Sequence, residues 1–342
     1  KIRENNLWNY KYTGNKWGGK YLRAPEIFFK ILEKGKDKFV RLEDVAKDYY
    51  GIKTGANEFF YLEPTENPAP KGLLHVKNSA GWEGFIEKEF LKPVIKSPRE
   101  LKTILVKEED LRYKVFMCHK SKQELKGTYA LKYIEWGEKQ GYHKRPTCAS
   151  RSRWMDIIES KGNILCIANI NDRLIFPFNE QNIIFEHTMY GLYFSSEDVK
   201  TYAFILNSTL TFLFLQLLGR TSLGEGSLGL MVYEYIRIPV VYKKNVKFDI
   251  TYSNKNFFTR EIKSIFEELG FQKCNQKNCK HPEHPYEYVK PEEVSFDRIM
   301  PDRRELDKII FEALGLTEEE QLEVYRAVLE LVKNRLLKAK SR

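Results

Sequence analysis

The chain has 342 residues, of which 42% are hydrophobic and 14% aromatic, and this composition excludes an intrinsically disordered protein. Its 57 Lys and Arg residues exceed its 47 Asp and Glu residues, so the formal net charge is +10. Such a surplus favours an acidic partner such as nucleic acid but does not identify a fold. The length is sufficient for two or three domains with their own cores.

The cysteine count and the apolar stretches bear on where the protein works. Five cysteines, an odd number, and the lack of an N-terminal signal sequence disfavour a secreted disulfide framework. The longest apolar stretch, residues 203–218, is too short and too polar to cross a bilayer. We therefore expect a cytoplasmic protein without a membrane partner. Because the sequence starts at Lys1 rather than at methionine, we also expect it to be part of a longer protein.

The first half of the chain is predicted to be rich in strands. Residues 1–35 form a lead-in segment that ends in a short amphipathic helix after Pro25. Apolar or alternating stretches separated by Gly, Pro and Asn then predict strands at 59–62, 114–117, 164–168 and 183–185. A capped, buried helix follows over residues 195–218. After a glycine-rich loop at 219–226, a strand at 235–240 closes this unit near residue 245.

The remainder, residues 246–342, is predicted to be mainly helical. A helix over 259–269 stops at Gly270, and two further helices are joined by Gly315. The expected fold class is therefore α+β: a strand-rich domain with a buried helix, followed by a mainly α-helical C-terminal region.

A glycine-bounded turn at residues 51–57 is the first candidate binding element. Its backbone amides, assisted by Lys53 and Thr54 and followed by Asn57, have the chemistry to hold a phosphate. The order of residues is not that of a nucleotide-binding P-loop. The alternative is a structural hairpin, because glycine is common wherever φ is positive.

A basic and aromatic block at residues 142–154 is the second candidate. Cations that grip phosphates and an indole that stacks on a base are typical of nucleic-acid surfaces. The alternative is a solvated charged loop whose tryptophan is anchored in the core. The residues concerned are Lys144, Arg145, Arg151, Arg153 and Trp154.

The third candidate set lies on two loops. Asn171 and Arg173, with Arg220 in the glycine-rich loop, are of the residue types that read base edges. Turns also use Asn and Asp freely, so this pattern is equally compatible with ordinary loop structure.

Four metal-ligating side chains lie within eleven residues, namely Cys274, Cys279, His281 and His284. They could fill a tetrahedral zinc shell and brace the segment 274–284. Their spacing is not that of a standard zinc finger, so a metal-free turn remains the alternative. A bound zinc would be structural, since protein would occupy all four positions.

No constellation of catalytic residues stands out. The chain lacks a glycine-rich loop for S-adenosylmethionine and the Asn/Asp-Pro-Pro-aromatic loop of DNA amino-methyltransferases. One enzymatic alternative is a stand-alone metal-dependent nuclease that uses Glu159 and Lys161 of a Glu-x-Lys sequence. The other alternative is a non-catalytic, zinc-stapled interaction module.

Loose but collinear motifs run through nearly the whole chain: Trp17 with Arg23-Ala24-Pro25, Val45-Ala46, residues 51–60 and 91–96, Lys144-Arg145 with Arg151 and Trp154, Leu206-Asn207-Ser208, Ile238-Pro239, residues 302–307 and 314–317, and Val324-Tyr325. Together they resemble the region that follows the catalytic domain of N6-adenine DNA methyltransferases. In particular, they are similar to the target recognition (specificity) portion of type IIG restriction-modification enzymes of the Taq-type family.

This resemblance implies a module that docks on double-stranded DNA and directs adenine-N6 methylation, restriction or both by a linked N-terminal domain. Residues 1–35 would lead in from that absent catalytic domain, residues 36–245 would form the recognition domain, and residues 246–342 would form a helical tail. S-adenosylmethionine would bind only in the absent domain. We therefore expect no catalysis by this chain alone.

Overall fold

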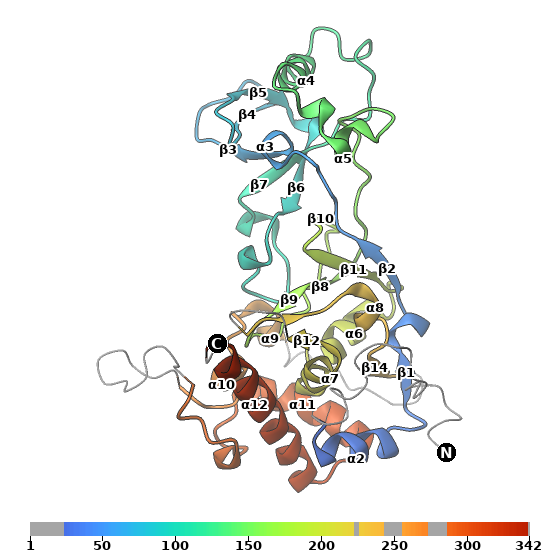
Figure 1. Cartoon of the computed structure of the whole chain (residues 1–342), viewed down its shortest axis with the longest axis vertical. Coiled ribbons are helices and arrows are strands. Elements are labelled where there is room, and N and C mark those ends of the chain that lie inside the picture. Colours follow the sequence, from blue (N-terminus) through green and yellow to red (C-terminus); the bar gives the residue numbers. More distant parts are fainter. Residues whose placement is uncertain (1–23, 222–225, 243–254, 273–285, 341–342) are drawn as a thin grey trace.

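The computed structural model describes residues 24–221, 226–242, 255–272 and 286–340. Figure 1 shows two lobes joined by a narrower waist. The core of the small lobe is formed by residues between 52 and 157, with Ile184. The core of the large lobe draws on residues 27–42, 95–106 and 164–332. The two cores are thus interleaved along the chain.

The small lobe is organised around a six-stranded sheet. Its strand order is β10-β6-β7-β3-β4-β5, and every pair is antiparallel except β10 with β6. Helices α3 (Asn57–Phe60), α4 (Tyr129–Lys139) and α5 (Pro146–Ala149) gather at its upper end (Figure 1). The strands are β3 (Tyr61–Pro64), β4 (Leu73–Lys77), β5 (Glu83–Glu87), β6 (Leu91–Ile95), β7 (Tyr113–Phe116) and β10 (Ile184–Phe185).

Aromatic packing fixes α3 against α4. The Tyr133 ring stacks on Phe59 with centroids 4.5 Å apart, and its hydroxyl donates a 2.5 Å hydrogen bond to the Phe59 carbonyl. Thr128 caps α4 by accepting a hydrogen bond from the amide of Leu131. Buried aromatic pairs of this kind contribute beyond the area they bury. The start of α3, and with it the turn at 51–57, is therefore held rigidly.

The large lobe contains three small sheets. The sheet nearest the waist has the order β2-β11-β8 and is antiparallel. Strand β1 pairs with β14, and the third sheet has the order β12-β13-β9. The strands are β1 (Phe39–Arg41), β2 (Lys47–Tyr50), β8 (Ile164–Ile167), β9 (Asn169–Ile170), β11 (Met189–Tyr193), β12 (Arg220–Thr221), β13 (Leu228–Gly229) and β14 (Pro239–Val241).

The buried helix is divided in two. The sequence predicts one helix over 195–218, but the structure has α6 (Val199–Leu206) and α7 (Thr209–Leu218), bent by 67°. Asn207 leaves the helix to accept a 2.9 Å hydrogen bond from the amide of Phe176, and Ser208 then caps α7. Among the described helices, none alone has the length and apolarity to cross a membrane, although this bent pair meets those criteria jointly.

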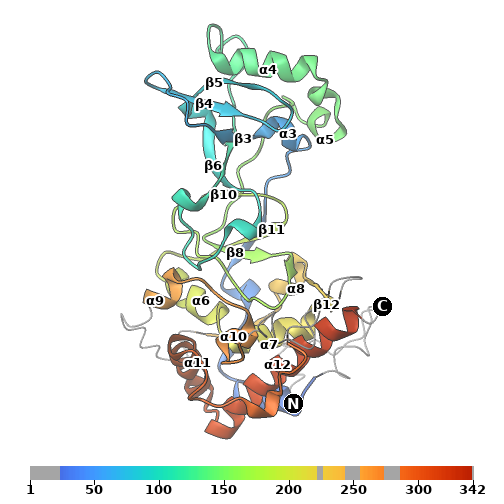
Figure 2. The same ribbon diagram turned by 90° about the vertical axis from the view of Figure 1, so that its left-hand side faces the viewer.

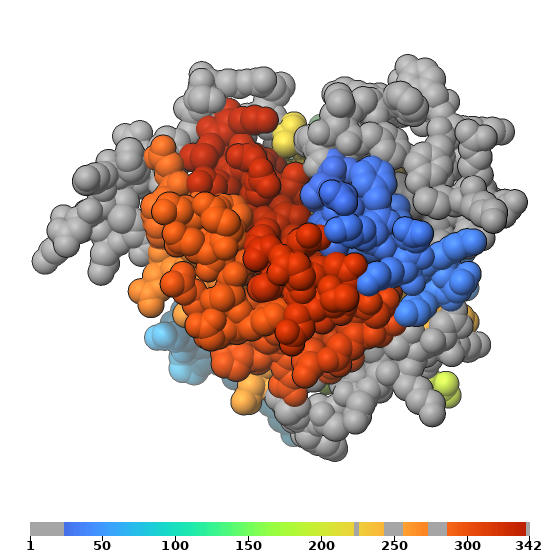
Figure 3. All heavy atoms as spheres, turned by 90° about the horizontal axis from the view of Figure 1, so that it is seen from below, coloured from blue at the N-terminus to red at the C-terminus, as the bar shows by residue number. Residues whose placement is uncertain are grey.

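Of the remaining helices, α2, α11 and α12 lie at the base of the large lobe, where α12 packs on α7 and α2, and α8 and α9 lie nearer the waist (Figure 2). Figure 3 shows α2 beside the C-terminal helices on the lower face. The ammonium of Lys34 in α2 lies 2.5 Å from Glu320 and donates to the carbonyl of Gly315. The bounds of the remaining helices are α2 (Glu26–Lys34), α8 (Val232–Tyr235), α9 (Lys255–Thr259), α10 (Ile265–Glu268), α11 (Pro301–Leu314) and α12 (Glu318–Lys340).

The predicted α+β class with a helical C-terminal region is confirmed, whereas several element boundaries are wrong. Residues 59–60 belong to α3 rather than to a strand. The helix predicted over 259–269 is instead two short helices, α9 and α10. Between them, Arg260 donates a hydrogen bond to Glu268, and the Ser264 side chain caps α10 by accepting one from the amide of Glu267. The strand predicted at 235–240 begins only at Pro239, after α8.

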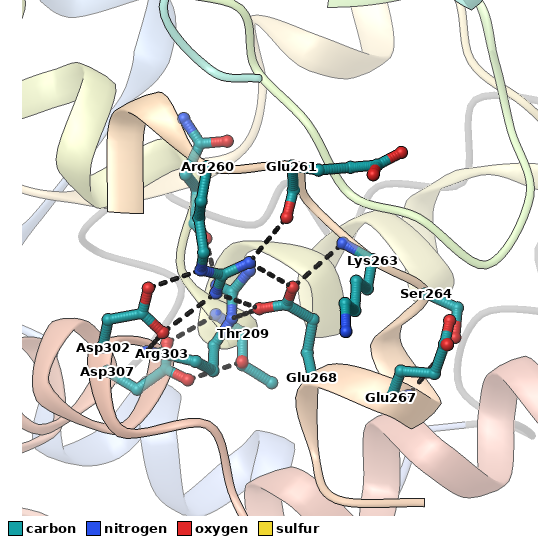
Figure 4. A network of polar contacts seen from close by, with 11 residues as sticks. Thr209, Arg260, Glu261, Lys263, Ser264, Glu267, Glu268, Asp302, Arg303 and Asp307 are labelled. Atoms are coloured by element: carbon teal, nitrogen blue, oxygen red, sulfur yellow. Dashed lines mark hydrogen bonds and ion pairs between the residues drawn. The ribbon is translucent and has the colours of Figure 1, made fainter. Parts of the chain in front are cut away.

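A buried network of polar contacts joins the C-terminal helices (Figure 4). Glu268 accepts hydrogen bonds from both terminal nitrogens of Arg260, at 2.7 and 2.8 Å. It also accepts one from Nε of Arg303 at 3.2 Å. Asp302 forms the second ion pair of Arg260. Because Arg303 and Glu268 are each 1% exposed, these charges depend on one another rather than on water.

The same network reaches the break between α6 and α7. Arg303 donates a 2.5 Å hydrogen bond to the carbonyl of Asn207. The Asp307 carboxylate accepts bonds from the amide and the hydroxyl of Thr209, at 2.7 and 2.6 Å. An acid at a helix N-terminus satisfies amides that lack partners within the helix. Helix α11 is thereby fastened to the first turn of α7.

This network predicts that the protein loses stability in acid. Burial alone would raise the pKa of Glu268 and of Asp302, but the hydrogen bonds and charges of their arginine partners hold both below their ordinary values of 4.5 and 3.8. Their contribution is therefore complete above those values and is lost as the pH falls through the lower, folded values. Asp307 acts in the opposite sense, because burial raises its pKa.

Glu268 and Asp302 lose stabilising interactions in acid, and only Asp307 acts in the opposite sense. We therefore expect the free energy of unfolding, measured by urea titration, to fall between pH 5 and pH 3. Asp302→Asn should show a shallower fall than the unaltered chain. A free energy that stays constant over this range would contradict the assignment.

Candidate nucleic-acid interface

The turn at 51–57 crosses the waist and is fixed by backbone contacts. The amide of Ile52 donates to the carbonyl of Phe185 at 2.8 Å, and the amide of His187 donates to the carbonyl of Ile52 at 3.1 Å. Gly51 lies so close that an added Cβ would be 2.3 Å from the carbonyl oxygen of Glu186. Only glycine fits there without backbone movement.

Within this turn, polar side chains divide between the interior and the solvent. Thr54 is buried and its hydroxyl is bonded to the side-chain oxygen of Asn57. Gly55 has φ +77°, a left-handed conformation that favours glycine, and it lies against Thr147. Lys53 and Asn57 are exposed. The turn thus presents an exposed ammonium group on a rigid backbone.

Arg151 joins the basic block to the turn. Its Nη2 donates to the carbonyls of Lys53 and Thr54, at 2.6 and 2.9 Å, and its Nη1 donates to the carbonyl of Trp154 at 2.9 Å. The guanidinium also lies 5.6 Å from the centre of the Phe60 ring. Its donors therefore satisfy protein carbonyls and brace the turn.

Trp154 is directed towards the small-lobe core. Its ring lies 4.7 Å from Phe59, and its indole nitrogen donates to the Glu138 carboxylate at 3.1 Å. The adjoining helix α4 leaves space for the indole at Gly137, where a Cβ would lie 3.0 Å from it. Trp154 thus connects the basic block to the core.

The other cations of the block differ in their partners. Lys144 is exposed, and the described residues offer it no ion pair. Arg145 is bonded to Glu58 at 2.8 Å, and this hydrogen bond holds the pKa of Glu58 below its ordinary value. Arg153 is bonded to Asp156 at 2.9 Å. Lys144 is therefore the cation of this block most available to a phosphate.

The third candidate set lies in the large lobe and does not converge on one point. Arg173 is partly buried and donates to the carbonyl of Leu101 at 2.9 Å, and burial lowers its pKa. Asn171 and Arg220 are exposed. Arg220 lies 3.2 Å from the carboxylate of Glu234 in α8.

Arg335 holds these two loops together, although no sequence pattern distinguishes it from the other cations of α12. It donates to the carbonyl of Asn171 at 2.6 Å, to the carbonyl of Gly226 and to the side chain of Gln216 at 3.1 Å. Burial lowers its pKa to about 10. The C-terminal helix thus supports the loops that carry Asn171 and Arg220.

Sequence reasoning also missed a group of exposed aromatic residues below the waist. Tyr50 ends β2, and Met231 and Tyr233 lie at the start of α8. In Figure 1, α5, the 51–57 turn, β2 and α8 follow one another down the same side of the molecule. The elements that carry the exposed cations and these apolar side chains therefore lie along one side of the molecule.

The remaining sequence candidates are the four metal-ligating residues and the Glu-x-Lys pair. Cys274, Cys279, His281 and His284 lie outside the described residues. Within the residues that are described, no three His, Cys, Asp or Glu side chains are grouped so that they could hold a metal ion. Glu159 and Lys161 are exposed on the segment that descends from α5 to β8.

This arrangement defines a mixed α+β domain with exposed cations and aromatic residues on neighbouring elements, and comparison with known proteins identifies its class. The chain belongs to the family described as the C-terminal domain of the type II methyltransferase M.Eco57I, whose model matches residues 14–270. The resemblance found in the sequence is thus confirmed. No curated protein sequence matches the chain.

The fold is similar to that of a solved enzyme, the type IIG restriction endonuclease BpuSI. The TM-score is 0.54 and the sequence identity is 11%. The alignment covers 94% of this chain and 34% of that chain, so the chain spans about a third of that enzyme's length. At this identity the likeness shows the fold alone.

Proposed function

We propose that this chain is the DNA sequence-recognition part of a restriction-modification enzyme. A linked domain of the same parent protein would bind S-adenosylmethionine and carry out adenine-N6 methylation, restriction or both. Membership of a family named for the C-terminal domain of a type II methyltransferase supports this proposal. The net charge of +10 also favours a polyanionic partner such as duplex DNA.

The single observation that carries the proposal is a pair of exposed lysines, Lys53 in the 51–57 turn and Lys144 just before α5. Lys53 and Lys144 have no acidic partner among the described residues, and Arg151 ties together the two segments that carry them. Phosphate contacts fix a protein on DNA, whereas contacts to base edges read its sequence. We assign phosphate contacts to Lys53 and Lys144, and a positioning role to Arg151.

The other candidates divide in the same way. Arg145 and Arg153 are half-exposed and could exchange their carboxylate partners for phosphates. Thr54, Trp154 and Arg173 support the surface from within, and exposed Asn57 accepts the hydrogen bond of the Thr54 hydroxyl. Asn171 and Arg220 are assigned to base edges. A cytoplasmic location and a structural zinc at residues 274–284 remain predictions from the sequence.

We expect the full chain to bind duplex DNA with a salt dependence that reports its phosphate contacts. Each contact contributes about 0.9 to the slope of log K against log salt concentration, so Lys53→Ala with Lys144→Ala should flatten that slope by about 1.8. The measurement is a titration of fluorescent duplex, chosen from a random pool, at several salt concentrations.

Lys308→Ala provides the matched control, since this lysine pairs with Glu312 on α11 at the base of the molecule. It should leave the slope unchanged. Failure of the unaltered chain to bind any duplex would refute the proposed function. An unchanged slope in the double variant would remove Lys53 and Lys144 from the interface.

A further inference from the structure

Three large side chains stand out from the surface below the waist. Tyr50 is 63% exposed, Tyr233 44% and Met231 39%. Single exposed apolar residues are common, but a contiguous group on one face marks a contact surface. We call Tyr50, Tyr190, Met231, Tyr233 and Arg220 the aromatic patch.

The patch is built on side chains that are fixed in the core. The Tyr50 ring meets the Tyr190 ring edge to face, with centroids 5.7 Å apart. The hydroxyl of Tyr190 donates to the sulfur of Met231 at 3.4 Å. Beneath them, buried Tyr235 donates to the carbonyl of Ile167 at 2.7 Å. The exposed rings therefore lie on an ordered base and would lose little conformational entropy on binding.

A cation is held over the same surface. The guanidinium of Arg220 lies 5.9 Å from the centre of the Tyr233 ring and is paired with Glu234. Glu234 also accepts a 2.8 Å hydrogen bond from the amide of Met231, so one carboxylate orients both Arg220 and the start of α8. Half of the Arg220 side chain is still exposed. Its remaining donors are available to a ligand.

The patch lies close to the phosphate-binding cations assigned above. Tyr50 precedes Lys53 by three residues, so the backbone between them spans at most about 11 Å. The major groove of DNA is about 12 Å wide. A phosphate on Lys53 would therefore place base edges within reach of Tyr50.

We propose that the aromatic patch is the surface that reads base edges in a groove of duplex DNA. This inference rests on the proposed function and deepens it. Tyr50, Met231 and Tyr233 supply apolar contacts of the kind that thymine methyl groups accept, and Arg220 supplies donors for guanine. Lys53 and Lys144 bind the phosphate backbone of the DNA, while the patch selects the DNA sequence.

The test compares specific with non-specific binding by the full chain. The probes are a duplex selected from a random pool and a scrambled duplex of the same length. Tyr50→Ala with Tyr233→Ala should weaken binding to the selected duplex by about tenfold or more. Affinity for the scrambled duplex and the salt slope should not change, because the phosphate contacts are intact.

Tyr193→Ala is the matched control. Tyr193 is 47% exposed on β11, but it pairs with Lys47 and so lies on the face opposite to that of Tyr50 and Tyr190. It should bind both duplexes as the unaltered chain does. If the alanine double variant has a lower thermal midpoint than the unaltered chain, the measurement is repeated with Tyr50→Gln and Tyr233→Gln, which remove less packing.

Each result separates this inference from the proposed function. An unchanged ratio of the two affinities, together with a flattened slope in the lysine variants, overturns the patch but leaves DNA recognition standing. With one strand of the selected duplex as a third probe, a loss of binding confined to that strand also overturns it, because the patch would then stack on unpaired bases. If the unaltered chain binds neither duplex, both proposals fall.

Discussion

Replacement of Arg303 by alanine is expected to destabilise the protein by about 3–5 kcal/mol. Arg303 is 1% exposed and donates to Glu268 and to the carbonyl of Asn207. Its removal leaves the Glu268 carboxylate buried with one arginine partner instead of two. It also leaves the Asn207 carbonyl, at the break between α6 and α7, without this donor.

The surface pair of Arg112 with Glu63 is the matched control. It has bidentate geometry, at 2.9 and 3.0 Å, but the Arg112 side chain is 62% exposed. Arg112→Ala should therefore cost far less stability than Arg303→Ala, because water screens the exposed pair. Urea unfolding of both variants measures the difference. Equal losses of unfolding free energy in the two variants would show that burial does not determine how much the Arg303–Glu268 pair stabilises the protein.

Substitution of Gly191 by alanine should destabilise the protein by about 2–3 kcal/mol or more, the cost of overpacking where neighbours cannot yield. An added Cβ would lie 2.0 Å from the carbonyl oxygen of Lys161 and 2.7 Å from the Phe185 ring. Opposite it, a Cβ on Gly162 would lie 2.5 Å from the Cα of Gly191. Two backbones thus pass at the waist without room for a side chain.

Gly229→Ala is the control for this second prediction. Gly229 also lies in a strand, β13, but a Cβ there would be 3.6 Å from its nearest neighbour, an ordinary contact. This substitution should change the thermal midpoint little, whereas Gly191→Ala should lower it by several degrees. Similar midpoints for the two variants would contradict the close approach at the waist.

Local patterns in the sequence were sufficient for the elements that depend on neighbouring residues. The helix after Pro25 and the two helices around Gly315 follow from periodicity and from end signals, and the structure has them as α2, α11 and α12. The break at Asn207 escaped prediction, because it depends on a hydrogen bond to Phe176. That partner is 31 residues away.

The candidate interface was predictable only in part for the same reason. The turn at 51–57 and the basic block carry local signals, and the structure joins them through Arg151. That Arg151 bonds to carbonyls nearly a hundred residues earlier is not visible in the sequence. The aromatic patch was missed, because it joins Tyr50 of β2 to Met231 at the start of α8 through Tyr190. The sequence separates α8 from β2 by most of the chain.

The interleaving of the two cores constrains any attempt to transplant specificity between related enzymes. Strand β10 completes the small-lobe sheet by pairing with β6, yet it comes after β8 and β9, which belong to the large lobe. A chimaera cut at a single pair of junctions around residues 52–157 would leave β6 beside a foreign edge strand. Grafts should therefore carry β10 together with the small lobe, or exchange surface side chains on an unaltered backbone.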